Sequence, residues 1–99
     1  LGGLAVRFLQ SVAQSLDADA VELTTALDNE SGWRTYLGAG FEHIGNIRNP
    51  LDVDVTAAIA GQAQATRYRE ERQMVYVVKP ARREVVMQYL ALKRAQSEA

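Results

Sequence analysis

The sequence contains no cysteine and a single histidine, His43, among its 99 residues. Without cysteine the chain has no disulfide, no thiolate metal site and no cysteine nucleophile, and one histidine excludes a multi-histidine metal cluster. No bound metal is therefore expected. No apolar run approaches the ~20 residues that span a bilayer, and no signal-peptide pattern is visible. These absences favour a cytoplasmic protein without a membrane partner.

The composition is that of a soluble globular domain, with 47% apolar and 23% charged residues. The length predicts one domain, residues 1–99, and there are no repeats or linker-like tracts. The chain begins with Leu1 rather than methionine, and its first residues already read as an amphipathic helix. We therefore expect a further segment to precede them.

Charge is balanced overall, at −1, but is unevenly placed. Residues 67–94 hold eight basic and three acidic side chains, whereas residues 1–66 hold three basic and eight acidic ones. A basic segment is either a solvated helix face or a nucleic-acid surface. Acidic residues are interleaved with the basic ones, and aromatic side chains for base stacking are few there. The solvated face is the favoured interpretation, so we do not expect a nucleic-acid partner.

Hydrophobic periodicity predicts the elements of the first half. A helix is expected from residue 1 to about residue 17, and alternation from Val21 to Leu27 predicts a strand. A short helix follows, with Asn29 among its candidate caps, and Gly38 and Gly40 end it. A second strand then begins near Phe41. The apolar stripe expected on the first helix is Leu1, Leu4, Ala5, Phe8, Leu9, Val12, Ala13 and Leu16.

In the second half, Asp52 or Asp54 is expected to cap a helix that runs to about Glu71. The run Met74 to Val78 is apolar at alternate and intervening positions, which predicts an interior strand. Pro80 then introduces a last helix from about residue 81 to 95. The fold class is α/β or α+β, and the first helix and strand imply an upstream strand parallel to the latter.

One spacing is more specific than these patterns. Asn29 precedes Tyr36 by seven residues, and Gly40 and Phe41 follow. This resembles the late motif of the GNAT superfamily of N-acetyltransferases, although Gly32 stands where alanine is usual and Thr35 where an apolar residue is usual. At the first helix, Gly3, Leu4 and Ala5 fit the last half of that family's pyrophosphate loop. The resemblance covers residues 1–48 by motif and 74–79 by pattern.

The resemblance implies a GNAT-like mixed sheet with flanking helices, of which this chain is the C-terminal part. Its N-terminal strands are missing from the chain, so the N-terminal half of the same domain is an expected partner, as is a second copy in a homodimer. In the family the last strand inserts beside the strand that carries the Asn. The helix expected after Asp52 and the one after Pro80 depart from the family's pattern.

The implied activity is transfer of the acetyl group of acetyl-CoA to an amine acceptor. Tyr36 would be the catalytic general acid toward the leaving sulfur. Gly3, Leu4 and Ala5 would bind the pyrophosphate, and Asn29 either contacts the pantetheine arm or only caps its helix. Trp33 and Phe41 are interpreted as core, and His43 as a surface residue or a wall of the acceptor site.

The general base is unassigned, with Glu22 and Glu42 both carboxylates in strands. Two alternatives stay open. One is a GNAT-like scaffold without catalysis, used in assembly or regulation. The other is a basic nucleic-acid module at the C-terminal end.

Overall fold

The computed structural model describes residues 3–50, 56, 59–61 and 67–98. In chain order its elements are helix α1 (Gly3–Ser15), strand β1 (Ala20–Ala26), helix α2 (Glu30–Gly38), strand β2 (Glu42–Pro50), strand β3 (Tyr68–Val77), a 3₁₀ turn (Pro80–Arg82) and helix α4 (Arg83–Ser97). The expected α+β class is confirmed. The strands predicted near Val21 and Phe41, and the helix after Pro80, are likewise confirmed.

The three described strands form one antiparallel sheet in the order β1-β3-β2. The last strand, β3, is central: Val21 lies opposite Tyr76 on one side, and Glu42 lies opposite Val75 on the other. Met74 and Val75 are fully buried. An interior strand at this position, as the sequence predicts, is therefore confirmed. The parallel neighbour expected for β1 would precede Leu1 and lies outside the described residues.

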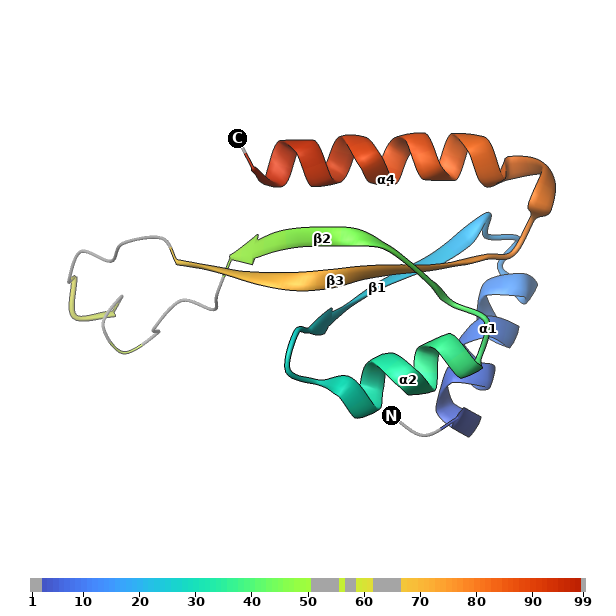
Figure 1. Cartoon of the computed structure of the whole chain (residues 1–99), viewed down its shortest axis with the longest axis horizontal. Coiled ribbons are helices and arrows are strands. Elements are labelled where there is room, and N and C mark those ends of the chain that lie inside the picture. The colour runs from blue at the N-terminus through green and yellow to red at the C-terminus, as the bar shows by residue number, and fades with distance from the viewer. Residues whose placement is uncertain (1–2, 51–55, 57–58, 62–66, 99) are drawn as a thin grey trace.

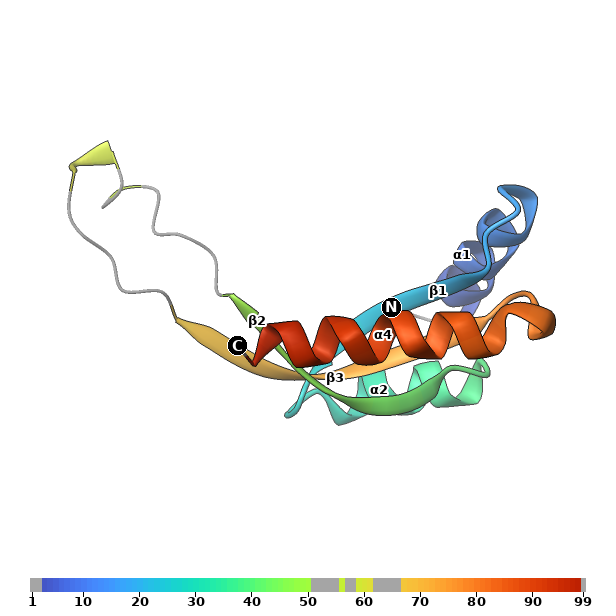
Figure 2. The same ribbon diagram turned by 90° about the horizontal axis from the view of Figure 1, so that it is seen from above.

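Helices cover both faces of the sheet. Helices α1 and α2 lie on one face, and α4 runs along the other (Figures 1 and 2). Because successive strand residues point to opposite faces, β3 serves both layers. Met74 packs with Val6 of α1 and Phe41, whereas the buried Gln73 contacts Arg94 of α4.

Helix α1 forms as predicted, but of the stripe expected to be buried, only Ala13 is buried among the described residues. Val6 is fully buried, and Leu4, Phe8 and Leu16 of the expected stripe are 85%, 72% and 74% exposed. The helix docks through Val6 and Ala13, and Gln10 between them donates from Nε2 to the carbonyl of Ala39 at 2.8 Å. The period indicated the helix correctly, but the burial of its stripe needs a neighbour that is not among the described residues. Leu1 lies outside them.

The helix expected from Asp52 or Asp54 to Glu71 is wrong at its end. Tyr68 already pairs with Pro50, and Glu71 with Ile47, in the β2–β3 ladder. Backbone pairing with β2 overrides the helical propensity of this charged segment. Of residues 51–66, the structure describes only 56 and 59–61, and Ala60 N–H bonds to the Thr56 carbonyl there at 3.1 Å.

Candidate functional site

The junction between β1 and α2 is built around Asn29. Its Oδ1 accepts the N–H of Gly32 at 3.0 Å, which confirms the predicted helix cap. The residue is exposed, and in the described part of the chain no group accepts from its Nδ2. Asn29 therefore caps the helix with one amide atom and presents the other, a donor, to solvent.

Gly32 makes this cap possible. A Cβ at Gly32 would lie 2.5 Å from Asn29 Nδ2, far inside van der Waals contact. The glycine at position 32 thus leaves room for the side chain of Asn29.

Tyr36 lies in α2, seven residues after the cap at Asn29. Its ring packs against Phe41, with 5.6 Å between centroids, and it borders the cluster of Val6, Phe41 and Met74. The side chain is half-buried. Its ring is fixed by packing against the core cluster.

The turn after α2 also follows the prediction. Gly40 has a φ of 95°, a left-handed conformation that glycine adopts at little cost. Phe41 N–H then bonds to the Tyr36 carbonyl at 3.0 Å. The glycine therefore sets Phe41, which is 2% exposed, directly against the ring of Tyr36.

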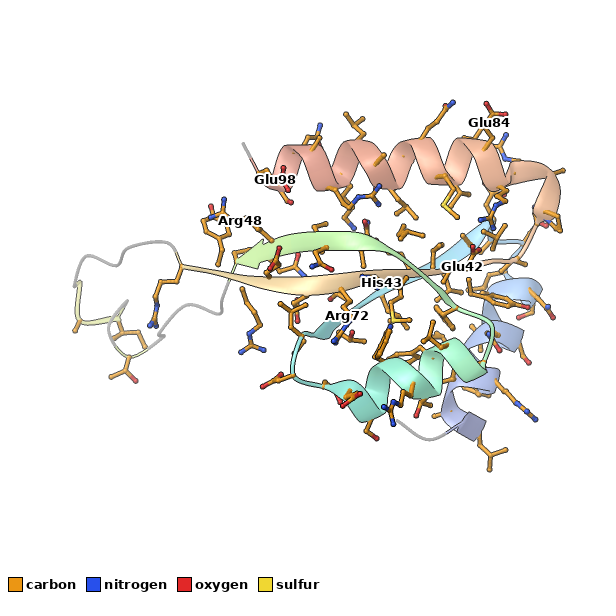
Figure 3. All side chains as sticks on the ribbon, in the orientation of Figure 1. Glu42, His43, Arg48, Arg72, Glu84 and Glu98 are labelled. Carbon is orange, nitrogen blue, oxygen red and sulfur yellow. The ribbon has the colours of Figure 1, made fainter. Side chains whose placement is uncertain are left out.

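A second group of side chains surrounds Trp33 on the face that α2 covers. The Arg72 guanidinium lies 4.7 Å from the Trp33 ring centroid and donates to the Ala26 carbonyl at 3.0 Å. His43 meets the edge of Trp33, with centroids 6.3 Å apart, and its Nε2 is 3.1 Å from Asn46 Oδ1. Figure 3 shows His43 and Arg72 on the α2 side of the sheet. His43 is exposed, as expected.

Arg72 was not predicted from the sequence as part of this site. It lies 39 positions after Trp33, and no local pattern links the two residues. The described residues contain two buried polar atoms without a hydrogen-bond partner, Thr25 Oγ1 and Trp33 Nε1. Trp33 is half-buried and packs against the core cluster, as interpreted from the sequence. Its ring also makes a cation–π contact with the Arg72 guanidinium.

The residues expected to bind pyrophosphate form the first turn of α1. Gly3, Leu4 and Ala5 are all exposed, and this turn carries no acidic side chain. A Cβ on Gly3 would meet nothing within 4 Å. The turn is electrostatically suited to an anion, because the free N–H groups of a helix start carry partial positive charge.

The other face of the sheet holds the carboxylates. Glu22 of β1 accepts from Gln73 Nε2 at 2.7 Å and from Lys93 Nζ at 2.6 Å, and the Lys93 pKa is raised by this hydrogen bond. Arg94 Nη1 donates to Gln73 Oε1 at 2.7 Å. A chain of polar contacts thus ties β1 to α4 through a glutamine that is fully buried.

Glu42 is paired with an arginine. Both of its oxygens accept from Arg83, at 2.5 and 2.7 Å, and the hydrogen bond from Arg83 lowers the pKa of Glu42. A carboxylate with a lowered pKa is a weaker base. Glu42 is therefore poorly suited to accept a proton.

Comparison with known proteins adds no family to this geometry. Neither protein-family models, curated proteins nor solved structures gave a match to this chain. Among the described residues, no group of three or more potential ligands could hold a metal ion. In the same part of the chain, every helix is too short or too polar to cross a bilayer.

Proposed function

We propose that the chain is the C-terminal part of a GNAT-like N-acetyltransferase, which transfers the acetyl group of acetyl-CoA to an amine. The observation that carries the proposal is the strand order. The last strand, β3, inserts between β1 and β2 and so lies beside the strand that leads to Asn29. The resemblance implies this arrangement, and the antiparallel β1-β3-β2 sheet supports it.

Tyr36 has the chemistry that the reaction needs. The neutral acceptor amine forms a bond to the acetyl carbon and gives up one N–H proton, the carbon–sulfur bond breaks, and the leaving thiolate takes a proton. The phenol of Tyr36 donates this proton, because a phenolic O–H can act as a general acid. Its ring is held against Phe41, which fixes the direction of the hydroxyl.

Asn29 and the start of α1 bind the coenzyme in this proposal. The exposed Nδ2 of Asn29 is a donor for an amide carbonyl of the pantetheine arm. The first turn of α1, with Gly3 and Ala5, binds the pyrophosphate through backbone N–H groups. Acetyl-CoA itself supplies the activated acetyl group as a thioester.

The exposed stripe of α1 fits the expected partners. Leu4, Phe8 and Leu16 are each more than two-thirds exposed, which is unusual for a contiguous apolar face. In this proposal the N-terminal half of the same domain covers the stripe, and a second copy completes a homodimer.

A scaffold without catalysis is the second candidate, because Glu42 is bound by Arg83 and the structure leaves the base unassigned. The nucleic-acid module is less favoured. Arg82 and Arg83, exposed cations at the start of α4, are paired with Asp19 and Glu42. Their charge is thus directed into the protein's own surface.

The test is turnover with a panel of amines and acetyl-CoA, measured by release of free thiol from the full-length protein that contains this chain. Acetylation of any amine above the no-enzyme rate supports the enzyme. Stabilisation by acetyl-CoA in a thermal-shift assay, with no turnover, supports the scaffold. A ligand that binds only the folded protein raises its Tm. Absence of both contradicts the proposal.

A further inference from the structure

Helix α4 does not cover the sheet evenly, and a groove of about 360 Å³ remains between it and β1. Val75 of β3 lies in the groove, and α4 supplies most of the apolar wall. We name it the α4 groove. Its lining is Asp19, Ala20, Glu22, Val75, Val85, Val86, Tyr89 and Leu90. The volume lies within the range of about 300–1,000 Å³ that small-molecule sites occupy.

The charged residues in this lining are all acidic. Asp19 and Glu22 are the charged residues that line the groove, and the wall opposite them is aliphatic or aromatic. A ligand that matches such a surface has an apolar body and a cationic end. The cations nearby bind these carboxylates from outside the lining: Lys79 and Arg82 contact Asp19, and Lys93 contacts Glu22.

Glu22 is held in position by groups behind it. Its Oε2 accepts from Gln73, and Gln73 in turn accepts from Arg94, so the carboxylate cannot rotate without breaking a buried polar chain. Its other oxygen, Oε1, accepts from the ammonium of Lys93 at 2.6 Å. That contact shows that Oε1 binds a primary ammonium group, because the Lys93 side chain is a primary amine on an aliphatic stem.

Lys93 is also replaceable. Its side chain is 45% exposed, and its flexible stem allows the ammonium to leave for solvent. A free primary amine in the groove would take its place at Glu22 Oε1 without disturbing the bond from Gln73.

The groove lies on the opposite face of the sheet from Tyr36, but over the same strands. Val75 points into the groove, whereas its neighbour Tyr76 packs on Phe41, which contacts Tyr36. The sheet therefore separates the groove from Tyr36.

We infer that the α4 groove binds a primary amine carried on an aromatic or branched aliphatic body, with Glu22 receiving the ammonium. Binding of this ligand does not depend on the proposed function, because the groove and Tyr36 lie on opposite faces of the sheet. Apolar contact with Val86, Tyr89 and Leu90 selects the body of the amine, and the charge-assisted hydrogen bond to Glu22 selects its head.

The experiment is titration of the ¹⁵N-labelled full-length protein with 2-phenylethylamine, 2-phenylethanol and 3-phenylpropionate, without acetyl-CoA. The amine should shift the amide signals of Glu22, Val75 and Leu90. The alcohol and the acid should bind at least tenfold more weakly, since a hydrogen bond to a charged group contributes ~1.5–3 kcal/mol. Because no coenzyme is present, failure of acetyl transfer and failure of amine binding are separate results.

Three variants and a control sharpen the test. Glu22→Gln keeps an acceptor for Gln73 but should weaken the amine roughly tenfold. Lys93→Met removes the competing ammonium and should strengthen binding of the amine. Tyr89→Ala, at an exposed position in the wall of the groove, should weaken binding of the amine without loss of folding. Glu84→Gln is the control, since Glu84 lies on α4 outside the groove lining (Figure 3).

Opposite responses to Glu22→Gln and Lys93→Met establish the site. Equal binding of amine and alcohol, signal shifts confined to other elements, or a Lys93→Met variant that binds no more tightly would each overturn the inference. Weakened binding in Tyr89→Ala keeps the test decisive if Glu22→Gln fails to fold.

Discussion

Gly45 in β2 leaves the space that the side chain of Arg94 in α4 occupies. A Cβ on Gly45 would lie 2.9 Å from both Cδ and Nε of Arg94. Gly45 follows a register shift in the β2–β3 ladder, and such bulges often redirect a strand. The contact matters because Arg94 donates to Gln73 Oε1 at 2.7 Å and Gln73 is fully buried.

Gly45→Ala should therefore destabilise the protein by about 1–3 kcal/mol, because Arg94 is displaced, the buried side-chain oxygen of Gln73 loses its donor, and the φ of 157° at Gly45 is unfavourable for alanine. Urea unfolding measures this change. Gly38→Ala is the matched control, since a Cβ there meets nothing within 4 Å, and it should leave stability equal or higher. Equal effects of the two substitutions would show that Arg94 does not need the space.

Tyr36→Phe should lower the rate of acetyl transfer by about 10²-fold or more, the usual contribution of a general acid. Acetyl-CoA affinity should stay near its original value, because only the hydroxyl is removed and the ring still packs on Phe41. Steady-state kinetics with the best amine gives kcat and KM separately. Turnover that persists unchanged would remove Tyr36 from the mechanism.

Gly32→Ala should change the cap more than the stability. The new methyl group forces Asn29 to turn away, which costs about 1 kcal/mol of capping, while alanine contributes up to about 1 kcal/mol of helix propensity. The amide of residue 32 should lose protection in hydrogen exchange, because Asn29 Oδ1 is its acceptor. Retained protection would mean that the asparagine accommodates the methyl group in place.

The burial of α1 predicts a contrast between two of its residues. Val6→Ala should cost about 2 kcal/mol, since Val6 is fully buried in the cluster with Phe41 and Met74. Phe8→Ser should cost little in this chain, because Phe8 is 72% exposed. Unfolding of both variants of the isolated chain tests this. A large cost for Phe8→Ser would indicate that the expected stripe is covered after all.

The Glu42–Arg83 pair predicts a response to acid. The hydrogen bond from Arg83 lowers the Glu42 pKa in the folded protein, so its stabilisation is complete above the unfolded value of about 4.3 and is lost as pH falls through the folded pKa. Glu42→Gln should therefore lose less stability than the wild type below about pH 4. The difference in urea midpoints should be small, because both side chains are half-exposed. If the wild type and Glu42→Gln lose stability in parallel as the pH falls, the Glu42–Arg83 pair does not contribute to the acid response.

Local patterns were sufficient where the chain's own backbone decides the outcome. The alternation of Val21 to Leu27 predicted β1, and the caps and glycines around Asn29 and Gly40 predicted both ends of α2. Local patterns failed where pairing with a distant strand competes with helix formation. Residues near Tyr68 have a helical composition, yet pairing with Pro50 makes them strand, and no window of the sequence contains both partners.

The sequence by itself determined α1, β1, α2, the helix after Pro80, the cap at Asn29 and the seven-residue spacing from Asn29 to Tyr36. These follow from hydrogen bonds and periodicity within a few residues. The tertiary structure alone decided that β3 inserts between β1 and β2, that Val6 rather than Phe8 is buried, and that Glu22, Gln73 and Lys93 meet beneath α4. Those outcomes depend on contacts between residues up to 71 positions apart, and their free energy arises only when separate elements exclude water together.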